Sequence, residues 1–182
     1  MKIKKLLTYF LMLIGFFSCS KALNFSGISL PSNDQMIIEL DNMTLYSNNM
    51  NAMISEKDGI KKLTIRANFM NEKPWRQINM YFYMKSDDLS TKDYRFANDC
   101  SNKSTCAVIS LHNDMNNVTT ENIFTTGLKG GQALVKITDL KLEVDGYIAG
   151  YFAAGLANLS VQGRLIKKGS FRIKIRDSMT NF

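Results

Sequence analysis

The chain has 182 residues, a formal net charge of +7 and one histidine. Three lysines within the first five residues supply much of that charge, so the rest of the chain is too weakly basic to indicate a nucleic-acid-binding protein. A single histidine also leaves little for the acid–base chemistry of common hydrolases, and we expect no catalytic residue, metal or cofactor.

Residues 1–18 have the order of a secretion signal. A lysine-rich start is followed by an almost wholly apolar run from Leu6 to Phe17, and small residues come next. About 12 apolar residues are too few to cross a bilayer. The sequence therefore predicts an exported protein whose signal peptide is residues 1–18.

Cys19 ends this apolar run, in the string Phe-Phe-Ser-Cys-Ser-Lys. The string resembles the lipoprotein signals common in Bacteroidota, although Phe16 replaces the leucine of the general consensus. The resemblance implies a lipid on Cys19, an anchor in the cell envelope at the outer membrane, and a tether over residues 19–33. Ordinary signal-peptidase cleavage after Ala22 is the alternative, and it would release a soluble secreted or periplasmic protein.

Residues 34–182 are predicted to form one all-β domain. Strand-sized segments rich in Thr, Val, Ile, Tyr and Phe alternate with clusters of Asn, Asp, Gly and Ser. We expect an antiparallel β-sandwich, with a lipocalin-like β-barrel around a small apolar ligand as the alternative. Periodicity leaves open whether the apolar faces meet each other or enclose a cavity.

Alternation of apolar residues marks most of the expected strands, whereas residues 113–131 show no clear pattern. The predicted strands are Gln35–Leu40, Ala52–Glu56, Ile60–Phe69, Gln77–Lys85, Tyr94–Phe96, Cys106–Leu111, Leu134–Val144, Tyr147–Ala153, Ser160–Ile166 and Phe171–Arg176.

Three turns set the expected registers. Asp58-Gly59 is a strong signal for a two-residue hairpin turn, and it places Ile54 opposite Leu63. Two later loops of three residues, 144–146 and 167–169, each end in a glycine that we expect at positive φ. A two-residue turn at Asp145-Gly146 fits the apolar pattern less well. The partners expected across these two loops are Leu142 with Ile148, Leu140 with Gly150, and Leu165 with Phe171.

Two Gly-x-Phe strings lie near the C-terminus, Gly150-Tyr151-Phe152 and Gly169-Ser170-Phe171. Together with the signal, they resemble the endings of β-rich secreted lipoproteins of Bacteroidota that have no known activity. The resemblance covers about residues 134–176 and implies a sandwich-like secreted domain.

Cys100 and Cys106 flank a short polar loop. In an oxidising compartment this spacing predicts a local disulfide, worth roughly 2 kcal/mol for so small a ring. A zinc site would need more ligands than these two cysteines and His112 supply. We expect His112 to be a strand-end histidine satisfied by local hydrogen bonds.

Trp75, Tyr81 and Tyr83 are candidate ligand-binding residues. The two tyrosines face away from the apolar side of their strand, with amide and basic groups nearby. Aromatic surfaces with a polar rim suit sugar rings or peptide segments. The alternative is that a second layer covers them, or that they serve only as good strand formers.

Four cations of the last expected hairpin form a candidate anion-facing strip. The expected register sets Arg164 directly opposite Arg172, with Lys174 and Arg176 nearby, and like charges in that position repel. Either neighbouring acids such as Glu143 or Asp139 neutralise them, or the strip meets an external anion.

These observations favour a lipid-anchored envelope protein with a non-enzymatic binding or surface-assembly role. The expected partners are the membrane, through the lipid, and possible further partners are an acidic glycan, lipid head groups or another envelope protein. A lipocalin-like carrier, and further behind a carboxylate-dependent glycan hydrolase, are the alternatives.

Overall fold

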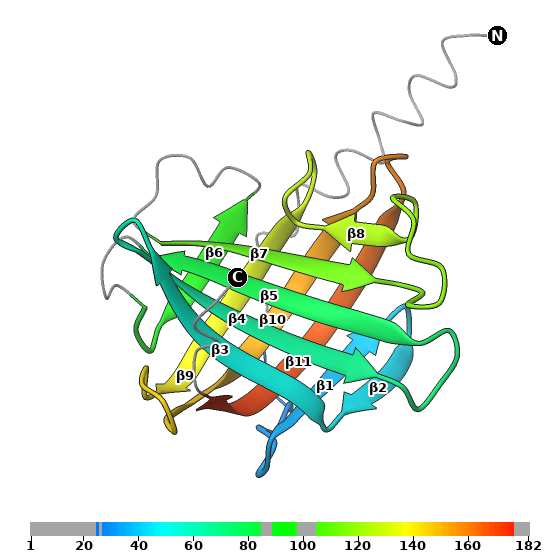
Figure 1. Ribbon diagram of the computed structural model, residues 1–182. Helices are drawn as coiled ribbons and strands as arrows, with labels where there is room; N and C mark the ends of the chain where they lie inside the picture. Colours follow the sequence, from blue (N-terminus) through cyan, green and yellow to red (C-terminus); the bar gives the residue numbers. More distant parts are fainter. Residues whose placement is uncertain (1–24, 26, 85–88, 98–104, 177–182) are drawn as a thin grey trace, which may run out of the picture.

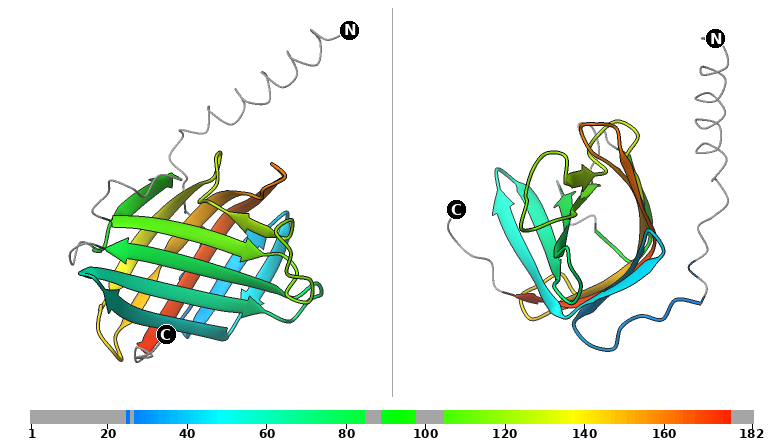
Figure 2. Two further views of the ribbon diagram at one scale, coloured as in Figure 1. Left: turned by 45° about the horizontal axis from the view of Figure 1, so that its top comes forward. Right: turned by 90° about the vertical axis from the view of Figure 1, so that its right-hand side faces the viewer.

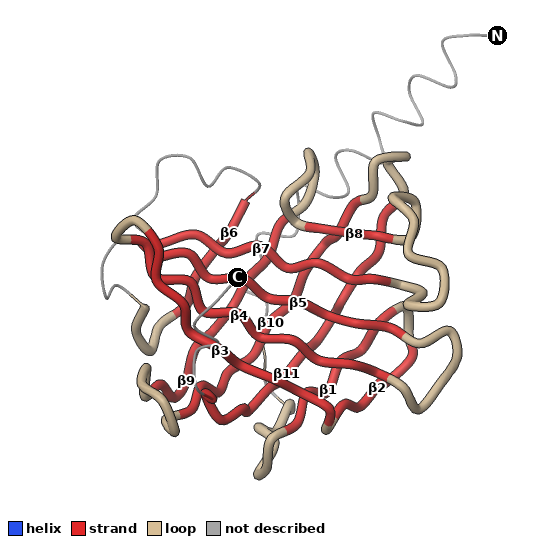
Figure 3. The backbone as a smooth tube through the Cα atoms, viewed as in Figure 1, coloured by secondary structure: helices blue, strands red, loops and turns tan. Residues whose placement is uncertain are grey.

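The computed structural model describes residues 25, 27–84, 89–97 and 105–176. Within these residues every regular element is a strand (Figure 3), so the all-β prediction is confirmed. In chain order the strands are β1 Gln35–Leu40, β2 Met43–Ser47, β3 Asn49–Lys57, β4 Ile60–Phe69, β5 Arg76–Met84, β6 Asp93–Ala97, β7 Thr105–His112, β8 Ile123–Thr125, β9 Gln132–Leu140, β10 Tyr147–Ala157 and β11 Gly163–Arg176.

The strands form one mixed sheet that folds over into two layers (Figures 1 and 2). The front layer has the order β3-β4-β5-β7, and the rear layer has the order β2-β1-β11-β10-β9-β6. The short β8 joins them, because Thr125 pairs with β7 and with β10, while the end of β11 runs parallel to β3. Strands of the two layers cross rather than align, as in orthogonal sheet packing.

The apolar faces of the two layers meet in one buried cluster. Its largest fully buried side chains are Phe82, Phe152, Phe171, Met36, Ile38, Leu40, Leu63, Ile65, Ile78, Met80, Met84 and Ile109. Each large strand contributes every second residue, which is the period that places side chains on one face. A lipocalin-like barrel would hold these faces around a ligand, whereas here the described apolar side chains pack together, as a sandwich requires.

The Asp58-Gly59 hairpin is confirmed. Both residues have positive φ, 53° and 72°, and Ile54 pairs with Leu63 as expected. This turn type matches the twist of the flanking strands and so fixes their register. A similar turn, Asp41-Asn42, joins β1 to β2, a strand that the sequence pattern did not predict.

The last predicted hairpin is wrong, because residues 163–176 form the single strand β11. Gly169 lies within that strand, between Ile38 of β1 and Phe152 of β10, and Leu165 pairs with Gly155 instead of Phe171. The register shifts by one residue near Lys167. Such a bulge moves the apolar residues from one face to the other, and the sequence pattern of a bulge resembles that of a three-residue turn.

The two Gly-x-Phe strings pair with each other across β10 and β11. Gly150 lies opposite Phe171, and Phe152 lies opposite Gly169, with the two rings 6.1 Å apart between centroids. A Cβ at position 169 would lie 2.3 Å from the Phe152 ring. Gly169 is therefore required by a close approach within the sheet rather than by positive φ.

The hairpin between β9 and β10 also differs from its prediction. Ile148 pairs with Leu140 rather than Leu142, because the connection spans six residues, 141–146. Positive φ was expected at Gly146, but Asp145 has it instead. A Cβ on Gly146 would lie 2.1 Å from the Lys141 carbonyl oxygen. Here too, a close backbone contact requires glycine.

The described part of the predicted tether lies against the outer face of the rear layer (Figure 2). Phe25 stacks on Tyr151 of β10, with ring centroids 5.6 Å apart. Residues 27–29 line a cleft of about 210 Å³ together with residues of β1, β2 and β11. Phe25 and residues 27–29 therefore lie on the side of the domain away from the front layer.

Candidate functional site

Tyr81 and Tyr83 lie on the outer face of the front layer, as predicted, and a lysine lies over both. Lys62 on the neighbouring β4 places its Nζ atom 4.6 Å from the Tyr81 ring centre and 5.4 Å from the Tyr83 ring centre. A cation over an aromatic face is attracted by the ring quadrupole. Tyr83 remains 36% exposed, so its ring can contact a partner.

Trp75 does not join this pair. It precedes β5 and is six residues from Tyr81, which corresponds to about 20 Å along an extended chain. Its ring lies near a different lysine, Lys73, at 6.0 Å. The structure therefore brings together two of the three predicted aromatic residues.

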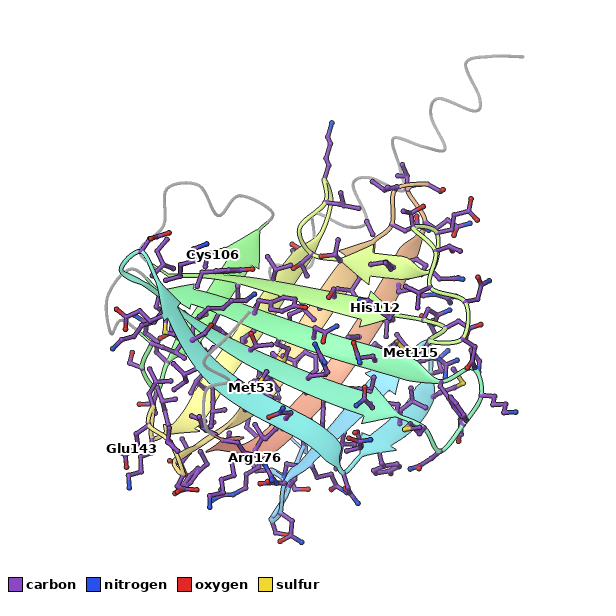
Figure 4. The ribbon with its side chains drawn as sticks, in the orientation of Figure 1. Met53, Cys106, His112, Met115, Glu143 and Arg176 are labelled. Atoms are coloured by element: carbon purple, nitrogen blue, oxygen red, sulfur yellow. The ribbon has the colours of Figure 1, made fainter. Side chains whose placement is uncertain are left out.

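The two tyrosines belong to a larger polar surface, which we call the amide–tyrosine face. It consists of the outward positions of the front layer, which pair in rows across its four strands. Three of these positions, Met53, Cys106 and His112, are labelled in Figure 4. Its members are Asn49, Asn51, Met53, Ser55, Lys57, Ile60, Lys62, Thr64, Arg66, Asn68, Gln77, Asn79, Tyr81, Tyr83, Cys106, Val108, Ser110 and His112.

Hydrogen bonds link the amides of this face into a chain. Arg66 Nε donates to Asn79 Oδ1 (3.2 Å), and Asn79 Nδ2 donates to Gln77 Oε1 (3.1 Å). Gln77 Nε2 donates to Asn68 Oδ1 (2.6 Å), and Asn68 Nδ2 donates to Asn49 Oδ1 (3.4 Å). The chain fixes the orientation of each amide, and preorganised groups lose less entropy when they bind a partner.

His112 differs from its prediction. It is the last residue of β7, but its Nδ1 atom is buried and has no hydrogen-bond partner among the described residues. Burial, with a smaller effect of the nearby Arg66 cation, lowers the pKa of His112 below its usual 6.5. The Oδ1 atom of Asn51 on β3 is likewise buried without a partner. Two polar atoms on this face thus have unused hydrogen-bonding capacity.

The charge on the amide–tyrosine face has one sign. Its cationic members are Lys57, Lys62 and Arg66, and none of its members is Asp or Glu. Arg66 is exposed and forms no ion pair among the described residues. Neutral or anionic groups are therefore the ligands that match the charge of these members.

The amides of this face were not predicted as site residues. The register of β3 and β4 already places Asn51 opposite Arg66, and that hairpin was predicted correctly. The missing information was the order of β4, β5 and β7, which places four polar rows side by side. Outward Asn and Gln residues on several predicted strands are the signal that could have indicated the face.

The candidate anion-facing strip is not supported by the structure. Arg164 and Arg172 lie eight residues apart on one strand, so they do not oppose each other. Each has its own acid: Arg164 Nη1 is 2.7 Å from Asp41, and Arg172 Nη1 is 3.9 Å from Asp139.

The other two members of the strip are Lys174 and Arg176. Lys174 Nζ lies 2.8 Å from Asp145, and the hydrogen bond between them holds the pKa of Asp145 below its ordinary value. Arg176 is the exposed last residue of β11. Because acids neutralise three of the four cations, the repulsion that motivated an external anion is absent.

Several predicted residues lie outside the described part of the chain. Cys19 and Cys100 are among them, so the lipid anchor and the disulfide remain predictions. Cys106 lies at the start of β7 and is 4% exposed. Asp114 lies in a hydrogen-bonded turn, because its Oδ1 accepts from the Asn116 backbone N–H at 2.9 Å. Within the described ranges no cluster of three or more metal-ligating side chains occurs.

Comparison of the chain with protein families, curated proteins and solved structures finds no match. In residues 25, 27–84, 89–97 and 105–176 there is also no helix with the length and hydropathy needed to cross a membrane. A functional assignment has to come from the residues themselves.

Proposed function

We propose that this protein is a non-enzymatic binding protein of the bacterial cell envelope, anchored by a lipid on Cys19, and that its amide–tyrosine face binds a glycan. The observation that carries the proposal is the combination on one surface of two tyrosine rings, a chain of five hydrogen-bonded side chains and no acid.

Sugar chemistry matches this surface in two ways. Pyranose rings have apolar C–H faces that pack on aromatic rings, and Tyr83 offers an exposed ring. Sugar hydroxyls both donate and accept hydrogen bonds, as do the amides of Asn51, Asn68 and Gln77. The cations Lys62 and Arg66 extend the range of ligands to acidic sugars.

The proposed anchor and the proposed site lie on different sides of the domain. Phe25, six residues after Cys19, stacks on the outer face of the rear layer, whereas the amide–tyrosine face belongs to the front layer. An anchor that approaches from the rear would leave the front layer open to ligands. The signal-like residues 1–18 and the string around Cys19 support the anchor.

Affinity electrophoresis against a panel of neutral and acidic polysaccharides tests the proposed binding. We expect at least one polysaccharide to retard the wild-type protein, and Tyr83→Ala to weaken that retardation about 3- to 10-fold, the effect of losing an aromatic contact of roughly 1 kcal/mol. Tyr46→Ala is the matched control, because Tyr46 is an exposed tyrosine on β2 of the rear layer. Equal retardation of both variants would contradict the site, and no retardation by any polysaccharide would contradict the ligand class.

A further inference from the structure

Two apolar side chains project from the turn between β10 and β11. This turn, residues 158–162, is called the β10–β11 tip and lies at one end of the rear layer (Figure 1). Leu159 is 66% exposed and Val161 is 87% exposed, the two highest values for large hydrophobic residues in the described part of the chain. A soluble domain has no structural need to place two such side chains together in water.

The β10–β11 tip is held in one conformation by Asn158, whose side chain is buried. Asn158 Nδ2 donates to the Glu121 carbonyl oxygen (2.8 Å) and to Gln162 Oε1 (3.1 Å). Its Oδ1 accepts from the Gln162 backbone N–H (2.8 Å). These hydrogen bonds therefore fix the backbone that carries the exposed side chains of Leu159 and Val161.

Val161 has a backbone conformation that valine rarely adopts. Its φ is 60°, in the left-handed region, where a β-branched side chain is strongly disfavoured. Glycine or asparagine would fit this position with less strain. Because stability alone would select another residue, the valine indicates a role for an apolar group at the tip.

We propose that the β10–β11 tip inserts Leu159 and Val161 into the interfacial region of a phospholipid bilayer. The segment 158–163 carries no charged residue. Its own acceptors bind the backbone N–H groups of Asn158, Val161 and Gln162. Both properties are needed by a segment that leaves water, because charges and unpaired backbone groups are costly in an apolar medium.

A protein partner fits the tip less well than a bilayer. Stable protein interfaces bury about 1,200 Å² or more, which two side chains on a narrow turn cannot supply. A bilayer requires only a few apolar side chains at its edge, especially when a second anchor is present.

The chain length allows the tip and the predicted anchor to reach one membrane. Phe25 lies six residues after Cys19, and this stretch of chain can span up to about 20 Å. Phe25 contacts Tyr151, which lies seven residues, or about 23 Å, before Asn158 along β10. The proposal does not depend on glycan binding, because it concerns the opposite layer.

Tryptophan fluorescence of the full-length protein in phosphatidylcholine vesicles tests the proposal. The chain has one tryptophan, so Trp75→Phe provides a silent background for Leu159→Trp. We expect the emission of this reporter to shift to shorter wavelength with vesicles, and to be quenched by brominated acyl chains. Raising the salt concentration should leave the quenching unchanged, because the contact is apolar. Tyr46→Trp on β2, in the same background, should show neither change.

Two results would overturn the proposal. In one, the reporter at 159 stays as accessible to aqueous iodide with vesicles as without them. In the other, it becomes shielded without vesicles as protein concentration rises, which would make a second copy of the chain the occupant.

A second variant separates the contribution of Val161 from any effect of the tryptophan introduced at position 159. Val161→Asn, combined with Leu159→Trp, should reduce quenching by brominated lipid several-fold while raising the midpoint of thermal unfolding, because asparagine tolerates positive φ. Val144→Asn is the matched control, since Val144 is 49% exposed beyond the opposite end of β10 and has no positive φ. A purely structural role for Val161 would lower stability instead, and equal quenching in both variants would contradict insertion.

Discussion

Replacing Gly169 by alanine tests the reciprocal pairing of the two Gly-x-Phe strings. The added Cβ would lie 2.3 Å from a ring carbon of Phe152, whereas carbon atoms in contact lie about 3.5–4.0 Å apart. The ring is fully buried against Phe171, so it cannot turn into solvent. Overpacking of this kind costs about 1–3 kcal/mol.

Alanine also brings a small gain, which has to be subtracted. Glycine within a strand is less stable than alanine by roughly 0.5–1 kcal/mol. The net expectation is that Gly169→Ala lowers the free energy of unfolding by about 1–2 kcal/mol, measured by urea denaturation. Gly155→Ala on β10 is the control, because its Cβ would meet only Gln132 Cγ at 3.8 Å, and it should be neutral or stabilising.

A double-mutant cycle shows whether the ring causes the cost. Phe152→Ala alone should destabilise by about 3–5 kcal/mol. Combined with Gly169→Ala it should cost less than the sum, because the new methyl group enters the space that the ring has left. Gly169→Asn distinguishes a glycine needed within a strand from a glycine needed at positive φ in a turn. Asparagine would be tolerated at positive φ, but it clashes here. The reasoning is refuted if Gly169→Ala is no more destabilising than Gly155→Ala, or if the two changes in the cycle are additive.

Three further predictions concern His112, the cysteines and the anchor. Burial lowers the pKa of His112 in the folded protein, so the unfolded chain binds the proton more readily. The stability that the neutral His112 contributes is therefore fully present above pH 6.5 and declines as the pH falls below that value. His112→Gln should therefore flatten the loss of thermal stability between pH 7 and pH 5, and an unchanged slope would contradict the burial. For Cys100 and Cys106, mass spectrometry of alkylated, unreduced protein should find both thiols blocked, and Cys106→Ser should lower stability without abolishing folding. For the anchor, an N-terminal peptide from membrane-extracted protein should begin at an acylated Cys19, whereas an unmodified peptide that begins at Leu23 would exclude lipidation.

Local sequence patterns predicted the front of the fold well. The register of β3 and β4 follows from one turn whose two residues both favour positive φ, and from matching apolar positions on each side. Such a signal is contained in about 20 consecutive residues, so no knowledge of the rest of the chain is needed.

The C-terminal strands show where local patterns are insufficient. A bulge near Lys167 and a three-residue turn both shift the apolar pattern by one position, and only the neighbours of the strand distinguish them. Here β1 and β10 flank β11 on both sides and keep it extended. The candidate site was partly predicted for a related reason: Tyr81 and Tyr83 were identified on one strand, but the amides join them only through pairing between strands.

Chemical-shift mapping with an oligosaccharide tests the central claim, glycan binding at the amide–tyrosine face, most directly. The ligand would be a fragment of the polysaccharide that retards the protein, titrated into isotope-labelled protein. We predict that the largest changes fall on the side-chain amides of Asn51, Asn68 and Gln77 and on the backbone around Tyr83. Changes confined to the outer face of the rear layer, or no saturable change anywhere, would contradict the claim.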